Sequence, residues 1–293
     1  MRRALLIIFT LIICATLSGC SKKQDSLTIG SKDFTEQYIL GNMLALYIEA
    51  NTNINASLMS DMASDVIFSA LRNGVIDIYI DYTGTIYGYH FSQRETLSPE
   101  EIFDISSWTI AENYGLYMFD PLGFNNTYQL AVRRDTAELY GLRTISDLAE
   151  VSSGLIFGGS AEILNRTDGI PNLKRVYGLS FKSEVAVDGA ARYIAITTDE
   201  IQVAEVFSTD GLLLSYDLVV LEDDLNFFPP YQGVIIVRGE VIEKHPEIRA
   251  LFADLSGLIS DNAMRDLNYR VDVLGETPYS VAERFLKLNN LIP

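Results

Sequence analysis

The sequence predicts an α/β fold in which short strands alternate with helices around a largely parallel sheet. Residues 27–80 and 154–206 each show short apolar runs, separated by segments with helical periodicity. Strands that alternate with helices are typical of βαβ units, whose strands lie parallel in one sheet. A pattern that recurs at a constant spacing of 125 residues also indicates two lobes of similar build.

The first stretch predicts strands at 27–29, 54–59 and 76–80 with helices between them. Asp33 and Glu36 have the spacing of a capping box, which predicts that the first helix begins there. Apolar residues follow at helical intervals, namely Phe34, Ile39, Met43, Leu46 and Tyr47. The second helix covers about 61–72 and ends at Asn73-Gly74, a typical C-terminal stop.

The second stretch repeats this alternation. We expect strands at 154–157, 181–185 and 201–206, with helices near 171–177 and 189–198. After Phe227-Phe228-Pro229-Pro230, a strand at 233–237 leads into helices that continue to Leu288.

The repeat places an aromatic residue after one strand of each stretch. Its members are Ala70, Ile76, Ile78, Tyr82 and Thr83 in the first copy and Ala195, Ile201, Val203, Phe207 and Ser208 in the second. Ligands of open α/β sheets bind at the carboxyl ends of strands, where Tyr82 and Phe207 would lie. A chance likeness between two helix–strand units explains the spacing equally well.

The N-terminus has the pattern of an export signal. Arg2-Arg3 precede an apolar run over 4–17, which is too short to remain as a membrane-spanning helix, and Leu17-Ser18-Gly19-Cys20 follows. This last string matches a bacterial lipobox, which predicts a signal peptide at 1–19, an acylated Cys20 and a polar tether at 20–26. The alternative is an ordinary cleaved signal with an incidental cysteine. Either way, the processed chain would keep one cysteine and form no internal disulfide.

Composition argues against several functions. The formal net charge of −17 argues against nucleic-acid binding, which calls for a basic surface. Only His90 and His245 are present, without metal-ligand spacing, and the sequence contains no nucleophile elbow or P-loop. We therefore expect no enzyme activity, cofactor or metal, and we interpret Asp77 and Asp81 as solvating charges.

A series of short strings covers nearly all of the chain after Cys20. They are Gly30-Ser31-Lys32-Asp33-Phe34-Thr35-Glu36-Gln37, Asn73-Gly74, Tyr82-Thr83-Gly84-Thr85, Gly123-Phe124-Asn125-Asn126-Thr127-Tyr128, Arg166-Thr167-Asp168-Gly169, Phe207-Ser208-Thr209-Asp210-Gly211 and Phe228-Pro229-Pro230-Tyr231. In this order the chain resembles the glycine betaine/carnitine/choline-binding proteins of osmoregulatory ABC transporters.

The resemblance implies a two-lobed, periplasmic-binding-protein type II fold with the ligand in a cleft between the lobes. The chain would cross between lobes twice, near 126–129 and 229–232. Lobe 1 would comprise about 26–127 and 232–293, and lobe 2 about 128–231.

The resemblance also implies an aromatic cage formed by Tyr82, Tyr128, Phe207 and Tyr231. A trimethylammonium group has no N–H to donate, so the negative faces of aromatic rings suit it better than ordinary polar contacts. Phe207 stands where the family usually has Tyr, which keeps the ring and loses a hydroxyl. Core packing is the alternative role for each ring.

Lys32 and Arg166 match the family positions that bind the ligand's carboxylate, and Thr85 could add a hydroxyl. Asp65 departs from the family pattern. It would repel a carboxylate or accept a ligand hydroxyl, or it would pair with Lys32 or lie exposed at a helix start. We interpret Tyr79, Tyr87, Tyr89 and Trp108 as structural.

These features predict the extracytoplasmic, lipid-anchored component of an ABC importer. Its partners would be a small quaternary ammonium ligand, a membrane permease with its ATPase subunit, and the membrane through the lipid. The alternative is the same fold binding another small solute, such as an amino acid, whose primary ammonium would call for carboxylates rather than a ring cage.

Overall fold

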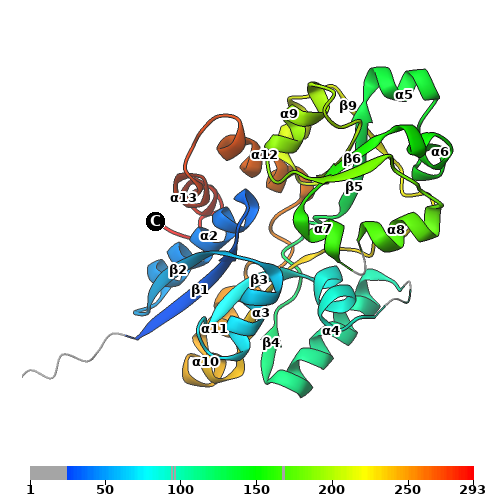
Figure 1. Cartoon of the computed structure of the whole chain (residues 1–293). Helices are drawn as coiled ribbons and strands as arrows, with labels where there is room; N and C mark the ends of the chain where they lie inside the picture. The colour runs from blue at the N-terminus through cyan, green and yellow to red at the C-terminus, as the bar shows by residue number, and fades with distance from the viewer. Residues whose placement is uncertain (1–24, 94, 96, 167–168) are drawn as a thin grey trace, which may run out of the picture.

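The computed structural model describes residues 25–93, 95, 97–166 and 169–293. These residues form two lobes, each built on a five-stranded sheet (Figure 1). The strand orders are β2-β1-β3-β10-β4 and β7-β6-β8-β5-β9. The predicted signal peptide, Cys20 and most of the predicted tether lie outside the described residues.

The first sheet comprises β1 (Ser26–Lys32), β2 (Asn55–Met62), β3 (Ile78–Tyr82), β4 (Leu116–Met118) and β10 (Gly233–Arg238). Strand β1 pairs in parallel with β2 and β3, whereas β10 runs antiparallel to β3 and β4. The helices of this lobe are α2 (Thr35–Asn51), α3 (Ser64–Arg72), α4 (Pro99–Tyr114), α10 (Gly239–Lys244), α11 (Glu247–Ala253), α12 (Asp261–Asp272) and α13 (Pro278–Leu288), with a π-helix η1 (Thr85–His90).

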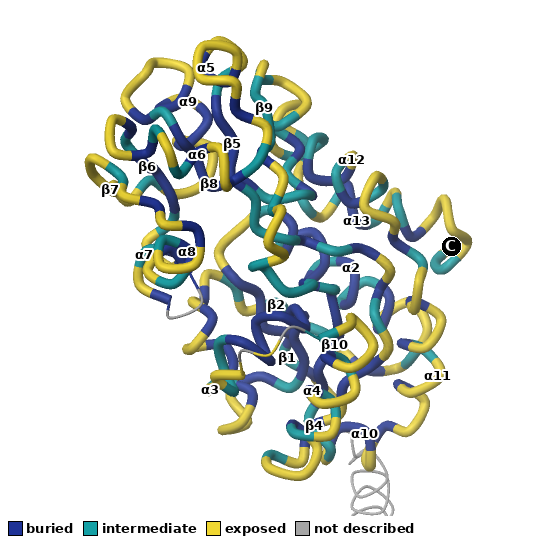
Figure 2. Tube along the Cα trace, turned by 90° about the vertical axis from the view of Figure 1, so that its right-hand side faces the viewer, coloured by how far each residue is buried: buried dark blue, intermediate teal, exposed yellow. Residues whose placement is uncertain are grey.

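Side chains of this sheet alternate between two apolar layers. Ile78 and Ile80 pack with α2 and α13 on one face, whereas Tyr79 packs with α3 and α4 on the other. This period of two is what extended backbone dictates, so a strand covered on both faces is apolar throughout. Every residue of β3 is buried. The edge strand β7 (Ser183–Ala186) of the second sheet is exposed instead (Figure 2).

The second sheet contains β5 (Tyr128–Arg133), β6 (Ile156–Gly159), β7, β8 (Val203–Phe207) and β9 (Leu218–Leu221). Its helices are α5 (Arg134–Tyr140), α6 (Ile145–Val151), α7 (Ala161–Asn165), α8 (Ile170–Tyr177) and α9 (Ala191–Thr197), with 3₁₀ turns η2 (Ser152–Gly154) and η3 (Gly211–Leu214). Strand β5 alone runs against the others, as β10 does in the first sheet. The prediction of an α/β fold with largely parallel sheets is therefore confirmed.

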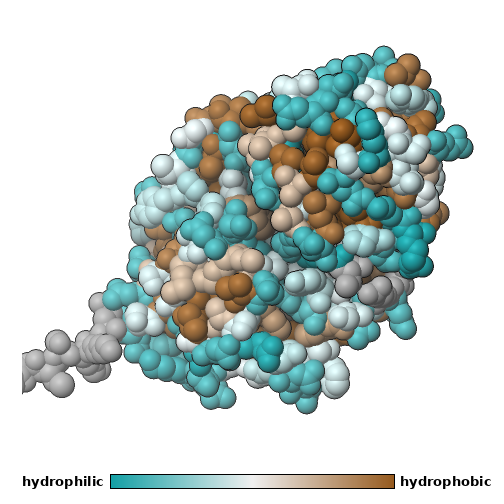
Figure 3. Space-filling view, viewed as in Figure 1, coloured by the Kyte–Doolittle hydropathy of each residue, from teal (hydrophilic) through white to brown (hydrophobic). Residues whose placement is uncertain are grey.

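The chain passes between the sheets twice, from β4 to β5 and from β9 to β10. The two connections touch, because Asn125 pairs with Gln232 and the Asn126 N–H donates to the Tyr231 carbonyl. Helix α12 forms a further link: it packs against η3, and Arg265 donates to the carbonyl of Ser208. Hydrophilic residues cover most of the face shown in Figure 3, with small hydrophobic groups between them.

Several predicted boundaries were wrong. The strands predicted to begin at 76, 154, 181 and 201 each begin two residues later. Ile76 and Ile201 are buried in the turn before each strand, where their N–H groups bond to Ala70 and Ala195 of the preceding helix. Both residues are as apolar as strand residues although they form no hydrogen bonds within the sheet, and the predicted strands therefore began too early.

The predicted capping box is also wrong. Helix α2 begins at Thr35, with Phe34 at the N-cap position and no side-chain capping bond. The helix predicted over 61–72 begins at Ser64, because β2 continues to Met62. In the predicted tether, Asp25 bonds to Lys244 and Ser26 opens β1, so both belong to the folded lobe.

Among the described residues, no helix combines the length and hydropathy needed to cross a bilayer.

Candidate functional site

A cavity of about 500 Å³ lies between the two lobes, and residues of both line it. The first lobe contributes the end of β1, the starts of α2 and α3, the end of β3 and part of α12. The second contributes the starts of β5, α7 and α9 and the end of β8. All eight residues predicted to bind ligand line this cavity: Lys32, Asp65, Tyr82, Thr85, Tyr128, Arg166, Phe207 and Tyr231.

The four predicted cage residues come from equivalent places in the two sheets. Tyr82 and Phe207 are the last residues of β3 and β8, the central strands. Tyr128 pairs with Phe207 across the ladder, and their ring centroids lie 4.8 Å apart. The Tyr231 ring meets Tyr128 edge-on at 5.2 Å. The repeat at a spacing of 125 residues therefore corresponds to equivalent strands of the two lobes.

Three further rings among the described residues line the cavity and were missed as site residues, namely Phe34, Tyr89 and Tyr193. Phe34 is 37% exposed and stacks on Tyr82 at 6.4 Å, although its sequence spacing placed it on the apolar face of a helix. Tyr89, which we interpreted as structural, lines the cavity and faces Arg166. Tyr79 and Tyr87 are buried in lobe 1 as expected, whereas Trp108 is 66% exposed.

Lys32 has a carboxylate partner in the core. Its Nζ lies 2.6 Å from Oδ1 of Asp81, and both residues are buried. Burial alone would raise the pKa of the Asp81 carboxyl, but Lys32 and His90 together hold this pKa well below its usual value. The interpretation of Asp81 as a solvating charge is therefore wrong, and the partner of Lys32 is Asp81, not Asp65.

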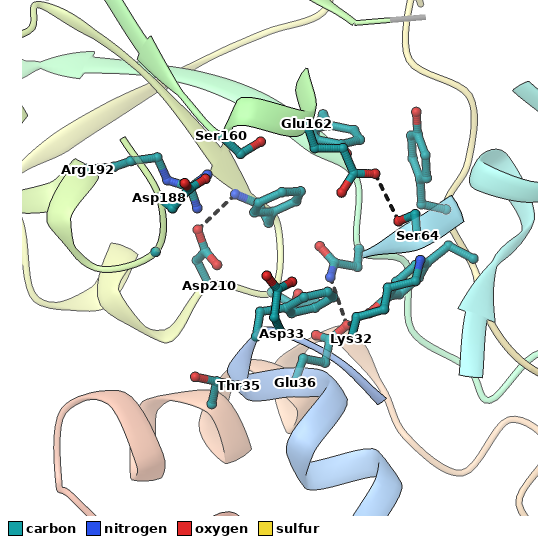
Figure 4. A pocket seen from close by; sticks show the side chains of 18 of the residues that line it. Lys32, Asp33, Thr35, Glu36, Ser64, Ser160, Glu162, Asp188, Arg192 and Asp210 are labelled. Carbon is teal, nitrogen blue, oxygen red and sulfur yellow. Dashed lines mark hydrogen bonds between the residues drawn. The ribbon is translucent and has the colours of Figure 1, made fainter. Parts of the chain in front are cut away.

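Arg166 is also buried and paired. It bonds to Glu162 at 2.9 Å, and its guanidinium lies 4.6 Å from the Tyr89 ring centroid. Glu162 in turn accepts a 2.9 Å hydrogen bond from the Ser64 hydroxyl (Figure 4). Since Ser64 and Tyr89 belong to lobe 1, these contacts join the lobes across the cavity.

Arg192 is a third buried cation, which sequence reasoning missed. It bonds to Glu205, and its guanidinium lies 5.3 Å from the ring centroid of Phe207. Lys32 lies 5.2 Å from the Tyr82 centroid, and Arg166 lies 5.8 Å from that of Tyr128. Three of the four cage rings therefore already interact with a cation of the protein, the contact expected of their negative faces.

Acidic residues outnumber basic ones in the described cavity wall. The acids are Asp33, Glu36, Asp65, Glu162, Asp188, Asp210 and Asp272, and the bases are Lys32, Arg166 and Arg192. Asp65 is exposed in the first turn of α3 and accepts a bond from the Val66 N–H, and Thr85 opens η1. Among the described residues, no cluster of His, Cys, Asp or Glu could hold a metal ion.

The fold and the cavity define a two-lobed solute-binding protein. Residues 25–288 match the family described as the substrate binding domain of ABC-type glycine betaine transport systems, and the chain belongs to that family. It is therefore the substrate-binding component of an ABC importer and not an enzyme. It works outside the cytoplasm, where it binds a small ligand and delivers it to a permease.

Similar proteins support this assignment. The carnitine transport binding protein OpuCC of Listeria monocytogenes is 32% identical over 302 residues, 99% of this chain and 98% of its own. The ergothioneine transport permease/ergothioneine binding protein EgtU of Helicobacter pylori is 35% identical over 90% of this chain, which spans about half (48%) of that protein. A crystal structure of a glycine betaine/carnitine/choline ABC transporter matches with a TM-score of 0.75 and 34% identity, over 90% of this chain and 99% of that chain.

Proposed function

We propose that the cavity binds a small quaternary ammonium osmoprotectant, with glycine betaine, carnitine and choline as candidates. The observation that carries this proposal is the convergence of Tyr82, Tyr128, Phe207 and Tyr231 from both lobes on one cavity. Cation–π contacts contribute about 0.5–2 kcal/mol per ring, so four rings approach the free energy of micromolar binding. The relatives named for carnitine and ergothioneine have ligands that share a trimethylammonium group.

We assign the ligand's polar end to Lys32, Arg166, Thr85 and Asp65. The two cations attract a carboxylate, whereas Asp65 accepts a hydroxyl and repels a carboxylate. Lys32 and Arg166 already bond to Asp81 and Glu162, which weakens their attraction for a further anion. Choline, which lacks a carboxylate, should therefore compete well with the zwitterions.

Titration calorimetry with glycine betaine, carnitine, choline and proline betaine tests the proposal, with an α-amino acid as the comparison. We expect binding of at least one quaternary ammonium compound, and at least a tenfold loss of affinity in Tyr82→Ala and Tyr231→Ala, because each variant removes one ring face. Binding of the amino acid alone would refute the proposed ligand class. Unchanged affinity in both variants would exclude those rings from the cage.

We further propose that Cys20 is acylated and anchors the protein to the membrane. The string Leu17-Ser18-Gly19-Cys20 after an apolar run supports this anchor. Acyl chains on one N-terminal residue suffice to keep a protein at a membrane surface.

A further inference from the structure

Glu36 is a buried carboxylate that contacts one of the cage residues. It lies in the first turn of α2, is 2% exposed and lines the cavity (Figure 4). Its Oε1 accepts hydrogen bonds from the Tyr82 hydroxyl at 2.6 Å and from the Asn126 amide at 2.8 Å. Its Oε2 accepts a bond from the Asn268 amide at 3.2 Å. Among the described residues, no Lys, Arg or His forms an ion pair with Glu36.

The bonding pattern around Glu36 is that of an ionised carboxylate. Each side chain with a recorded hydrogen bond to Glu36 is the donor, namely the Tyr82 hydroxyl and the amides of Asn126 and Asn268. The Tyr82 oxygen accepts a hydrogen bond from Gln37 at 3.0 Å, so the Tyr82 hydroxyl proton is left to donate to Glu36. Burial raises the pKa of the Glu36 carboxyl above its usual value, although hydrogen bonds to Tyr82, Thr209, Asn126 and Asn268 counteract part of that rise.

The side-chain amides of Asn126 and Asn268 each use their N–H groups to donate to Glu36. The Oδ1 atoms of Asn126 and Asn268 are buried and accept no hydrogen bond from the described residues. Buried carbonyl groups usually find a donor, so turning both N–H groups toward Glu36 has a cost. A negative charge on Glu36 accounts for this orientation, because hydrogen bonds to ionised groups are the stronger ones.

The charge on Glu36 acts on Tyr82 in two ways. The hydroxyl both donates to Glu36 and accepts from Gln37, which fixes the ring in one orientation. A hydrogen bond from a phenol to a carboxylate also polarises the phenol toward a phenolate. The ring face then becomes more negative and attracts a cation more strongly.

The same carboxylate connects the lobes. Asn126 lies on the first connection between the sheets, and Asn268 of α12 also donates to the Thr209 carbonyl at 2.9 Å, just after β8 of lobe 2. The orientation of Tyr82 is thereby tied to the contact between the lobes.

We propose that Glu36 is a positioning residue of the cation site, which orients Tyr82 and makes its ring more negative, so that the cavity prefers a cation over a neutral molecule of the same shape. This inference rests on the proposed function.

The experiment compares matched ligands with Glu36→Gln. The probes are choline, glycine betaine and carnitine, each beside its carbon analogue, in which a tert-butyl group replaces the trimethylammonium group. The choline pair compares a cation with a neutral alcohol, and the other two pairs compare a zwitterion with an anion. Glu36→Gln should weaken the cationic member of a pair about tenfold and the carbon analogue less than twofold, because only the charge changes. Glu49→Gln, on the exposed end of the same helix, should change neither affinity.

Tyr82→Phe is the second variant, because it keeps the ring and removes the bond to Glu36. It should lose the cation preference to a similar extent, and Glu36→Gln added to Tyr82→Phe should change the affinity for the cationic probes little further. Tyr82→Phe alone decides the matter if Glu36→Gln folds poorly, and the cycle does so if the carbon analogues bind too weakly to measure.

Equal weakening of both members of each pair would overturn the inference, because it would mean that Glu36 only supports the shape of the cavity. Additive effects of the two substitutions would also overturn it, because they would mean that Glu36 does not act through Tyr82. Wild-type protein that binds none of the three quaternary ammonium compounds would instead overturn the proposed function and the inference with it.

Discussion

At the residue scale, the cavity wall uses paired charges. Lys32, Arg166 and Arg192 are each buried, and each bonds to a carboxylate. An isolated buried charge costs several kcal/mol, whereas a paired and hydrogen-bonded charge is tolerated. Asp81 is the most completely satisfied partner, because Lys32, the Tyr79 hydroxyl, the Tyr82 N–H and His90 surround it.

Asp81→Asn should destabilise the protein by about 3–5 kcal/mol, because it leaves the buried Lys32 without a counter-charge. Urea unfolding at neutral pH measures this loss. The double variant Lys32→Met with Asp81→Asn should recover much of it, since the stranded charge is gone. A single variant as stable as wild type would show that Lys32 is not held by this ion pair.

The same pair predicts a pH dependence. The folded-state pKa of Asp81 is lowered, so its contribution to stability is present above the ordinary value of 3.8 and is lost as the pH falls toward the folded-state value. The stability difference between wild type and Asp81→Asn should therefore shrink as unfolding is measured from pH 5 toward pH 2.

At the scale of elements, the turn between β3 and η1 determines where one cage ring lies. Gly84 has right-handed helical backbone angles that alanine also adopts. A Cβ at this position would nevertheless lie 2.8 Å from the ring of Tyr231 and 2.9 Å from the carbonyl oxygen of Pro230. The missing side chain is what allows the second connection to place Tyr231 beside β3.

Gly84→Ala should displace the Tyr231 ring and lower ligand affinity by about tenfold or more, since a small misplacement of a ring removes most of its cation contact. Calorimetry with the best ligand of the panel measures the effect. Gly154→Ala is the matched control, because a Cβ there meets no atom within 4 Å. Equal ligand affinities of the two variants would show that a displacement of the Tyr231 ring does not weaken ligand binding.

At the scale of the whole molecule, the lobes are joined by the two connections and by contacts beyond them. The Ser64 hydroxyl donates to Glu162 across the cavity. Helix α12 packs against η3, and its residue Asn268 donates to Glu36. A hydrogen bond between lobes exists only when they approach, so these contacts stabilise the arrangement in which the cavity is enclosed.

The membrane attachment of the whole molecule depends on a single side chain if Cys20 is acylated. Cys20→Ala should abolish incorporation of labelled palmitate in a bacterial host and move the protein from the membrane fraction to the medium or periplasm. Ser21→Ala is the control and should leave both unchanged. Palmitate labelling that survives in Cys20→Ala would exclude this anchor.

Local pattern was enough to predict the α/β class, the alternation of strands and helices, and the aromatic residues at the strand ends. The period of the apolar residues reports local backbone geometry. The eight cavity residues were predicted from the resemblance to the glycine betaine/carnitine/choline-binding proteins. The boundaries of 76–80 and 201–206 were misjudged because a buried turn residue and a strand residue are equally apolar.

The role of Glu36 could not be predicted in the same way. Local spacing assigned it to a helix cap, yet its partners Tyr82, Asn126 and Asn268 lie 46, 90 and 232 residues away along the chain. Arg192 and Tyr89 were missed for the same reason. The elements and the kinds of side chain at their ends follow from the sequence alone, because propensity and periodicity are local. Which charges are buried and paired became clear from the folded chain, because burial and pairing depend on residues brought together from distant parts of the sequence.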